Sequence, residues 1–297
     1  MDKPPLPNNS KSNNPSRSSV LLSYISQSPL SRLNIRSILT LAAPLLATLL
    51  SLLHPLPTTK PPTTTCKDIH IFLARGSKEP YPGRQLSTAT TICNRLTKSC
   101  DYENIIYPAI HDEGYCTSVS TGISNARKAI EAYVEKCPES LVVLSGYSQG
   151  AHVVGDLLGG GGGTGCLGGG CVLERTRGMD VDGVVGRKVL AVLLFGDVRH
   201  TPGQPYNHGS GRDGQHSCWP RTETELQELR PWNDRIFSYC HAQDGVCAAG
   251  WGNGVRTCHF AYFGEHPEYE RDVGVDVLGE SARFVEGRLA VWEGGAA

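Results

Sequence analysis

The fold is decided by residues 141–150 (LVVLSGYSQG), which are followed directly by residues 151–158 (AHVVGDLL). The first part of this stretch is apolar throughout, as is typical of a parallel strand that is covered on both faces. The motif Gly146-Tyr147-Ser148-Gln149-Gly150 matches the sharp strand-to-helix turn that carries a nucleophilic serine, where side chains at the glycine positions would clash. In a chain with 34 glycines the motif alone is weak evidence. The strand before it and the helix after it make Ser148 the predicted nucleophile.

Strand and helix patterns alternate on both sides of this turn. Short apolar runs predict further strands at residues 70–74, 104–107, 189–195 and around 236–239. Apolar residues at helical spacing predict a helix over residues 119–134 that stops near Cys137-Pro138, and the pattern ends with a terminal helix over about residues 276–291. This alternation favours an α/β fold with a central parallel sheet and helices on both faces.

A glycine-rich segment interrupts the pattern, with nine glycines in residues 159–170 and cysteines at positions 166 and 171. No Lys-Ser/Thr pair follows it and no strand leads directly into it, so it does not match a phosphate-binding loop. We predict a flexible surface loop that is closed by a local disulfide between Cys166 and Cys171.

Residues 1–65 are predicted to form a separate, non-catalytic region. Residues 1–36 are basic and rich in Ser, Asn and Pro, which is typical of disorder, and an apolar segment follows at residues 38–53. Positive charge before such a segment predicts a cleaved secretory signal or, alternatively, an uncleaved signal anchor, with the following residues exported in both cases. The Pro- and Thr-rich residues 54–65 predict an extended linker, so the catalytic domain comprises residues 66–297.

The cysteine content agrees with export. All 11 cysteines lie between Cys66 and Cys258, and several disulfides are expected in an oxidising compartment. The odd number leaves one thiol unpaired or bonded to another molecule. No pair has the CxxC spacing and the histidines are scattered, so no metal site is predicted. The formal net charge of -1 argues against a nucleic-acid partner.

A serine nucleophile needs a histidine base that is oriented by a carboxylate, and in this fold class the chain order is Ser, Asp or Glu, then His. Asp244 lies just after the last predicted strand, between two cysteines whose bridge would hold it at the carboxyl edge of the sheet. His259 lies on the following loop. We predict the pair Asp244 and His259, with Asp234 and His241 as alternatives. Three other histidines are expected on surface loops: His200, His208 and His216.

Several separated motifs are familiar as a set. They are Phe72-Leu-Ala-Arg-Gly-Ser77, Tyr107-Pro-Ala109, Cys137-Pro138, the turn at Ser148, Phe195-Gly-Asp197, His200-Thr-Pro-Gly-Gln204, Tyr206-Asn207, Ser238-Tyr-Cys240, and His259 with Tyr262. On these motifs, the chain from Cys66 to about Leu289 resembles the cutinase family, which includes fungal cutinases and acetylxylan esterases.

The resemblance implies a lidless α/β-hydrolase fold, with Ser148 as nucleophile, Asp244 as orienting acid and His259 as base. It assigns the oxyanion hole to Ser77 and to the backbone N–H of Gln149. No metal or organic cofactor is implied. The resemblance also implies two disulfides, Cys66–Cys137 and Cys240–Cys247. Apart from the Cys166–Cys171 bridge, it leaves open the pairing of Cys93, Cys100, Cys116, Cys218 and Cys258.

The expected function is that of a secreted, monomeric serine carboxylic-ester hydrolase. Its substrates would be ester bonds of plant surface or cell-wall polymers, either a cutin-like polyester or an acetylated polysaccharide such as xylan. If residues 38–53 remain uncleaved, they would anchor the catalytic domain to the outside of a membrane. The alternative is a secreted or wall-anchored binding protein that keeps the fold without turnover.

Overall fold

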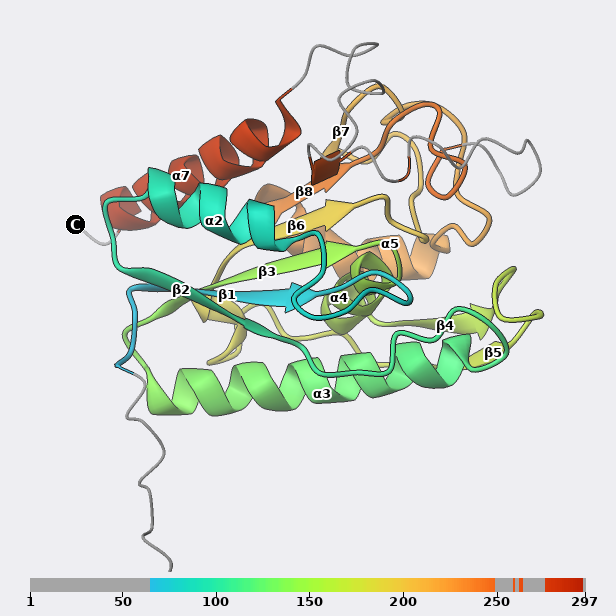
Figure 1. Ribbon diagram of the computed structural model, residues 1–297, viewed down its shortest axis with the longest axis horizontal. Coiled ribbons are helices and arrows are strands. Elements are labelled where there is room, and N and C mark those ends of the chain that lie inside the picture. Colours follow the sequence, from blue (N-terminus) through green and yellow to red (C-terminus); the bar gives the residue numbers. More distant parts are fainter. Residues whose placement is uncertain (1–64, 249–258, 260–261, 264–275, 296–297) are drawn as a thin grey trace, which may run out of the picture. The chain divides into compact units, whose positions relative to one another are not determined.

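The computed structural model describes residues 65–248, 259, 262–263 and 276–295 (Figure 1). All of the predicted N-terminal region except Thr65 lies outside these residues, so the domain boundary, the signal or anchor and the linker stay predictions. In the part of the chain that is described, no helix combines the length and apolar character that crossing a membrane would require.

A six-stranded sheet forms the centre of the catalytic domain, in the order β2-β1-β3-β6-β8-β7, and every neighbouring pair is parallel. The strands β1, β3, β6 and β8 are buried along their whole length, which explains their apolar sequences. The predicted α/β class is confirmed. The strands are β1 (Ile69–Ala74), β2 (Cys100–Asn104), β3 (Leu141–Tyr147), β6 (Val189–Phe195), β7 (Asn207–His208) and β8 (Ile236–Tyr239).

Helices cover both faces of this sheet (Figure 1). Helices α2 (Leu86–Arg95) and α7 (Val277–Gly295) lie on one face, and α3 (Tyr115–Lys136) and α4 (Gln149–Gly159) lie on the other. Alternate side chains of each strand point to opposite faces, so every central strand contributes to two cores. Within the described residues, the remaining helices are α5 (Glu223–Leu229) and the short 3-10 turns η2 (Gly186–Lys188) and η3 (Arg230–Arg235).

The second strand lies earlier in the chain than predicted, at Cys100–Asn104 instead of residues 104–107. It is an edge strand whose residues are exposed or only partly buried, so its sequence CDYEN carries no apolar signal. The apolar residues Ile105 and Tyr107 belong to the core, but they lie on the connection after the strand. These apolar residues therefore indicate a buried segment, but not the position of the strand.

The prediction of a flexible surface loop at residues 159–170 is wrong. The segment begins an antiparallel hairpin of β4 (Gly161–Thr164) and β5 (Val172–Thr176). The local Cys166–Cys171 bridge is also wrong, because Cys171 bonds to Cys116 at the start of α3 and Cys166 bonds to Cys218. At the tip of the hairpin, the Gly165 N–H already donates to the Cys171 carbonyl over 3.1 Å. Backbone pairing thus closes the tip, and both sulfurs bond to neighbouring segments.

Three more disulfides are present in the described residues: Cys66–Cys137, Cys93–Cys100 and Cys240–Cys247. The first joins the segment before β1 to the end of α3, and the second joins α2 to the edge strand. The third closes the loop after β8. Cys258, whose pairing the sequence leaves open, lies outside the described residues.

Candidate active site

Ser148 forms the turn between β3 and α4. Its φ of 54° and ψ of -118° are rare for a residue other than glycine, and they are typical of a strained strand-to-helix turn. The Ser148 N–H donates to the Phe195 carbonyl of the neighbouring strand over 2.9 Å. A Cβ on Gly146 would overlap the Gly150 carbonyl, and a Cβ on Gly150 would overlap the Ala74 carbonyl. Both glycines are therefore required by the close approach of backbone to backbone.

The Ser148 side chain lies in a pocket whose lining also includes Ser77 and His259. The backbone N–H of Gln149 is the first of helix α4 and has no acceptor within the helix. The buried Gln149 side chain donates to the Ile110 carbonyl over 2.6 Å, which fixes the start of the helix. The other lining residues are Lys78, Arg84, His111, Tyr115, Tyr147, Leu167, Val198 and Val246.

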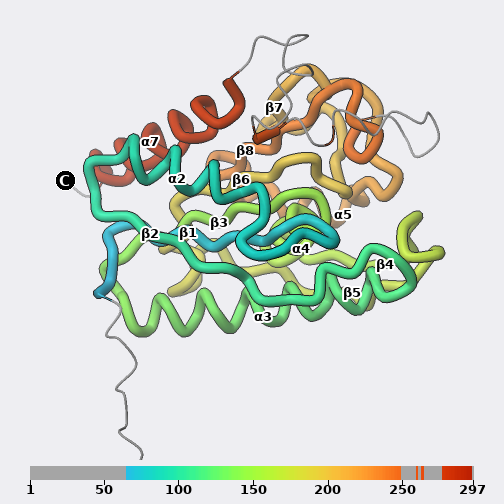
Figure 2. Tube along the Cα trace, in the orientation of Figure 1, coloured from blue at the N-terminus to red at the C-terminus, as the bar shows by residue number. Residues whose placement is uncertain are grey.

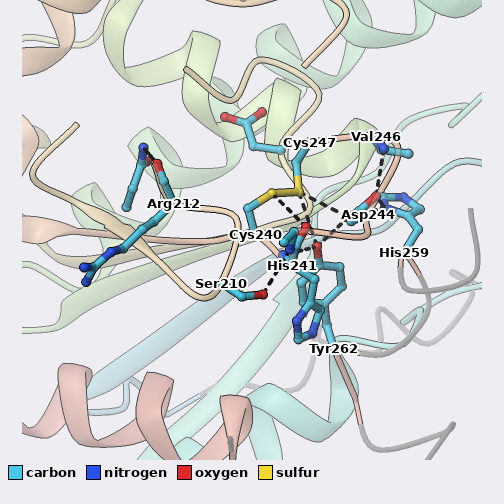
Figure 3. Close-up of a disulfide and its surroundings, with 12 residues drawn as sticks. Ser210, Arg212, Cys240, His241, Asp244, Val246, Cys247, His259 and Tyr262 are labelled. Carbon is cyan, nitrogen blue, oxygen red and sulfur yellow. Dashed lines mark hydrogen bonds and ion pairs between the residues drawn. A yellow bond between two sulfur atoms is a disulfide. The ribbon is translucent and has the colours of Figure 1, made fainter. Parts of the chain in front are cut away.

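Asp244 and His259 are directly hydrogen-bonded (Figure 3). The His259 Nδ1 lies 3.0 Å from Asp244 Oδ1 and 2.9 Å from Oδ2. The Tyr147 ring stacks on the His259 imidazole at a centroid distance of 5.0 Å, and the Tyr147 hydroxyl donates to the His259 carbonyl over 2.7 Å. The histidine is therefore held from its ring face, its backbone and its Nδ1 atom, which leaves Nε2 as the atom that can act as a base.

The Asp244 carboxylate is completely buried and accepts hydrogen bonds from several donors (Figure 3). The Tyr262 hydroxyl donates to Oδ2, and the Val246 N–H donates to Oδ1 over 2.8 Å. Burial raises the pKa of Asp244, but the charge of His259 and the hydrogen bonds outweigh burial, so that its pKa lies below the ordinary value. The group is consequently a carboxylate at neutral pH.

Gly196, which follows β6, is a residue of this site that sequence reasoning did not single out. Its φ is +56°, and a Cβ would lie 2.8 Å from His259 Cε1 and 3.0 Å from Asp244 Oδ2. Any side chain would push the imidazole and the carboxylate away. The only signal in the sequence is a glycine directly after a buried strand, within the motif Phe195-Gly-Asp197.

Of the alternatives, Asp234 lies apart from this pair, whereas the His241 carbonyl accepts from the Asp244 N–H over 3.0 Å. Among the described residues, the His241 ring neither hydrogen-bonds to the Asp244 carboxylate nor lines the pocket of Ser148. Asp234 is exposed, on the 3-10 turn that precedes β8, at the opposite end of that strand from Asp244. His241 is buried and stacks on the Tyr262 ring at 4.8 Å, and its Nε2 has no hydrogen-bond partner in the described part of the chain. The structure thus brings Asp244 and His259 together, and neither alternative replaces them.

The expectation of a surface loop is wrong for His200, which is buried, and for His208, which lies in a strand. His200 is only 2% exposed, because the turn after β6 folds inward. The His200 carbonyl accepts from the Ser217 N–H over 3.1 Å. His208 is partly buried in β7 and stacks on the Phe237 ring at 4.2 Å. His216 is exposed.

Asp156 lies on α4, two turns after Ser148, in a buried network of charges. Its carboxylate oxygens are 2.6 Å from an Arg221 nitrogen, 3.2 Å from an Arg199 nitrogen and 3.1 Å from His152 Nε2. Burial raises the pKa of Asp156, but the charges of His152 and the two guanidinium groups outweigh burial and hold the pKa well below its usual range. The network ties the helix of the serine turn to the segments after β6 and before α5.

Replacing Asp156 by asparagine is expected to lower the free energy of unfolding by about 3–5 kcal/mol, because two buried guanidinium groups lose a charged partner. Urea unfolding followed by tryptophan fluorescence measures this. The matched control is Asp213→Asn, since Asp213 pairs with Arg212 where the two side chains are 66% and 63% exposed. That change is expected to cost less than about 1 kcal/mol. Equal effects of the two substitutions would contradict a structural role for the network.

No group of three or more His, Cys, Asp or Glu side chains within the described residues is arranged to hold a metal ion.

A model of the cutinase family matches residues 65–270, which is more than half of the chain. Cutinase 11 of Verticillium dahliae is 26% identical over 210 residues, which are 68% of this chain and 66% of that protein. An acetylxylan esterase of Hypocrea jecorina is 30% identical over 196 residues, 62% of this chain and 60% of that protein. The chain thus matches less than two thirds of the length of these curated relatives.

Among solved structures, the catalytic core domain of acetyl xylan esterase from Trichoderma reesei is similar, with a TM-score of 0.60 and 25% identity. The match covers 75% of this chain and 100% of that domain. The family model, the relatives and this fold agree, and the chain therefore belongs to the cutinase family.

Proposed function

We propose that this protein is a serine carboxylic-ester hydrolase. The observation that carries the proposal is the hydrogen-bonded pair Asp244–His259 in the same site as Ser148, which lies on a strained turn in a pocket that His259 also lines. Membership of a family whose relatives are named cutinase and acetylxylan esterase supports the same reaction type.

In the proposed mechanism, the Ser148 hydroxyl attacks the ester carbonyl while His259 Nε2 accepts its proton. Asp244 accepts from the Nδ1–H, which fixes the tautomer and stabilises the imidazolium that forms. The oxyanion of the tetrahedral intermediate is bound by Ser77 and by the Gln149 N–H at the start of α4, where the helix dipole also favours negative charge. His259 returns the proton to the leaving alcohol, and water then hydrolyses the acyl-enzyme by the same steps.

Two measurements test the reaction type. The wild-type protein is expected to hydrolyse p-nitrophenyl acetate, and a fluorophosphonate probe is expected to label Ser148 stoichiometrically, because only an activated serine reacts with it. Peptide mapping locates the label. A folded protein that neither turns over the ester nor reacts with the probe would instead be a binding protein on the same fold.

We further propose that the protein is secreted and acts as a monomer on plant surface or cell-wall polymers. Five disulfides in the described residues support an oxidising, extracellular environment. N-terminal sequencing of the exported protein distinguishes a cleaved signal from an anchor at residues 38–53.

The natural polymer is expected to be either acetylated xylan or a cutin-like polyester. Incubation with each polymer separates them, since the first releases acetic acid and the second releases hydroxy fatty acids. Release of neither product by an enzyme that is active on p-nitrophenyl acetate would contradict both polymer assignments and leave the esterase reaction intact.

A further inference from the structure

The hairpin of β4 and β5 contributes one side chain to the catalytic pocket. Leu167, at the tip of the hairpin, lines the same pocket as Ser148 and His259 and is only 5% exposed. It belongs to the hydrophobic cluster that also contains Tyr115 and Val198, two further lining residues. A part of the chain that is expected from its sequence to be a surface loop thus forms an apolar wall of the site.

Two disulfides fasten this tip from both sides. Cys116–Cys171 joins it to the first turn of α3, and Cys166–Cys218 joins it to the segment before α5. Figure 2 shows the hairpin beside the beginning of α3, and contacts between α3 and β5 agree with this view. The tip is therefore fixed in its position relative to the pocket.

Close packing at two glycines adds to this fixation. Gly168, at φ +58°, lies so close to Tyr115 that a Cβ would approach the Tyr115 Cβ to 2.7 Å, and a Cβ on Gly165 would overlap the Trp219 ring. The Tyr115 hydroxyl is 3.1 Å from His152 Nδ1, and the Trp219 ring meets the His152 ring edge-on at 5.0 Å. His152 lies one turn after the nucleophile on α4. The wall is consequently packed against the helix that carries the serine turn.

The lining of the pocket contains both polar and apolar side chains. Its polar part consists of Lys78, Arg84 and His111, and its apolar part is formed by Tyr115, Leu167 and Val198, which belong to one hydrophobic cluster, with Val246 packed against it. A hydrocarbon acyl chain is favoured by the apolar part, because burying its methylenes removes them from water. The alcohol of a polysaccharide ester carries hydroxyl groups that would lose hydrogen bonds there, so it fits the polar part.

We propose that Leu167 closes the acyl side of the pocket and limits the enzyme to short acyl groups, which makes acetyl esters its substrate class. This inference rests on the proposed esterase function. A wall held by two disulfides and by close glycine contacts cannot retreat before a longer chain, so each added methylene meets Leu167.

The test compares Leu167→Ala with the wild-type protein on p-nitrophenyl acetate, butyrate and octanoate, which share one leaving group. The wild type is expected to prefer acetate. In the variant, the ratio of kcat/KM for octanoate to that for acetate is expected to rise by about 10-fold or more, since discrimination of even one methylene reaches this size. The ratio is independent of the amount of folded enzyme, because both esters are measured on the same sample.

Two further variants keep the test decisive. If Leu167→Ala does not fold, Leu167→Val is expected to raise the same ratio to a smaller extent. Val172 lies on the same hairpin and is 69% exposed, so the substitution Val172→Ala is expected to leave the ratio unchanged. An unchanged ratio in the Leu167 variants, or an equal rise in Val172→Ala, would overturn the inference. An inactive wild-type protein would instead overturn the esterase function on which the inference rests.

Discussion

Replacing Ser148 by alanine is expected to lower kcat/KM for p-nitrophenyl acetate by on the order of 10^5-fold and to abolish labelling by a fluorophosphonate. In the proposed mechanism the Ser148 hydroxyl forms the acyl-enzyme, whereas Ser77 and the Gln149 N–H would still bind a developing oxyanion. A small activity above that of water is therefore expected to remain. Steady-state kinetics of purified variant and wild type provide the measurement.

The matched control is Ser120→Ala, because Ser120 is an exposed serine on α3, where alanine is a favourable helix residue. Its kinetics and labelling are expected to equal those of the wild type. A Ser148→Ala protein that keeps more than about 1% of the activity, after the removal of any contaminating wild type, would mean that another residue is the nucleophile.

The site could be predicted largely because its parts follow from local patterns. Residues 141–158 contain a buried strand, a glycine-flanked serine and a helix, so one stretch of sequence is enough to predict the turn. The pairing of Asp244 with His259 was selected by chain order and by position after a strand. The hydrogen bond from the Tyr262 hydroxyl to Asp244 and the requirement for glycine at position 196 could not be predicted, because both depend on which loops meet in the folded chain.

The fold could be predicted where strands are buried on both faces. Strands β1, β3, β6 and β8 lie at or close to the predicted positions. The edge strand β2 differs from its predicted position because it is polar, and the sequence does not predict the short helix α5 because ETELQEL is mostly polar. Elements at the border of the sheet contribute few side chains to the core, and apolar periodicity is therefore weakest there.

The glycine-rich hairpin shows a different limit of sequence reasoning. Glycines at positions 165 and 168 predict flexibility by their residue type, but in the structure they allow close packing against Trp219 and Tyr115. Cys166 and Cys171 are close to each other in sequence, but each bonds to a cysteine more than 50 residues away in the chain. Proximity in sequence therefore predicts the wrong pairing. Asp156, Arg199 and Arg221 are buried by other tertiary contacts, and spacing along the chain does not predict the burial of these three charged groups.

Replacing Asp244 by asparagine is expected to reduce kcat at pH 7 by about 10^4-fold while the protein stays folded. Asparagine has one acceptor oxygen, whereas the carboxylate accepts from His259 Nδ1, the Tyr262 hydroxyl and the Val246 N–H. If the NH2 of the asparagine side chain faces His259, it donates to Nδ1. The imidazole proton then sits on Nε2, the atom that must accept the proton of Ser148. The imidazolium that forms during catalysis also loses the negative charge that stabilises it.

Asp234→Asn is the matched control, because Asp234 is exposed on the 3-10 turn before β8, and it is expected to have wild-type kinetics. Tyr262→Phe removes one donor but keeps the carboxylate and the tautomer of His259. Its kcat is therefore expected to fall by only about 10-fold, the size of one hydrogen bond to a charged group. If Asp244→Asn lost no more activity than Tyr262→Phe, Asp244 would be a structural carboxylate and a different group would orient the base.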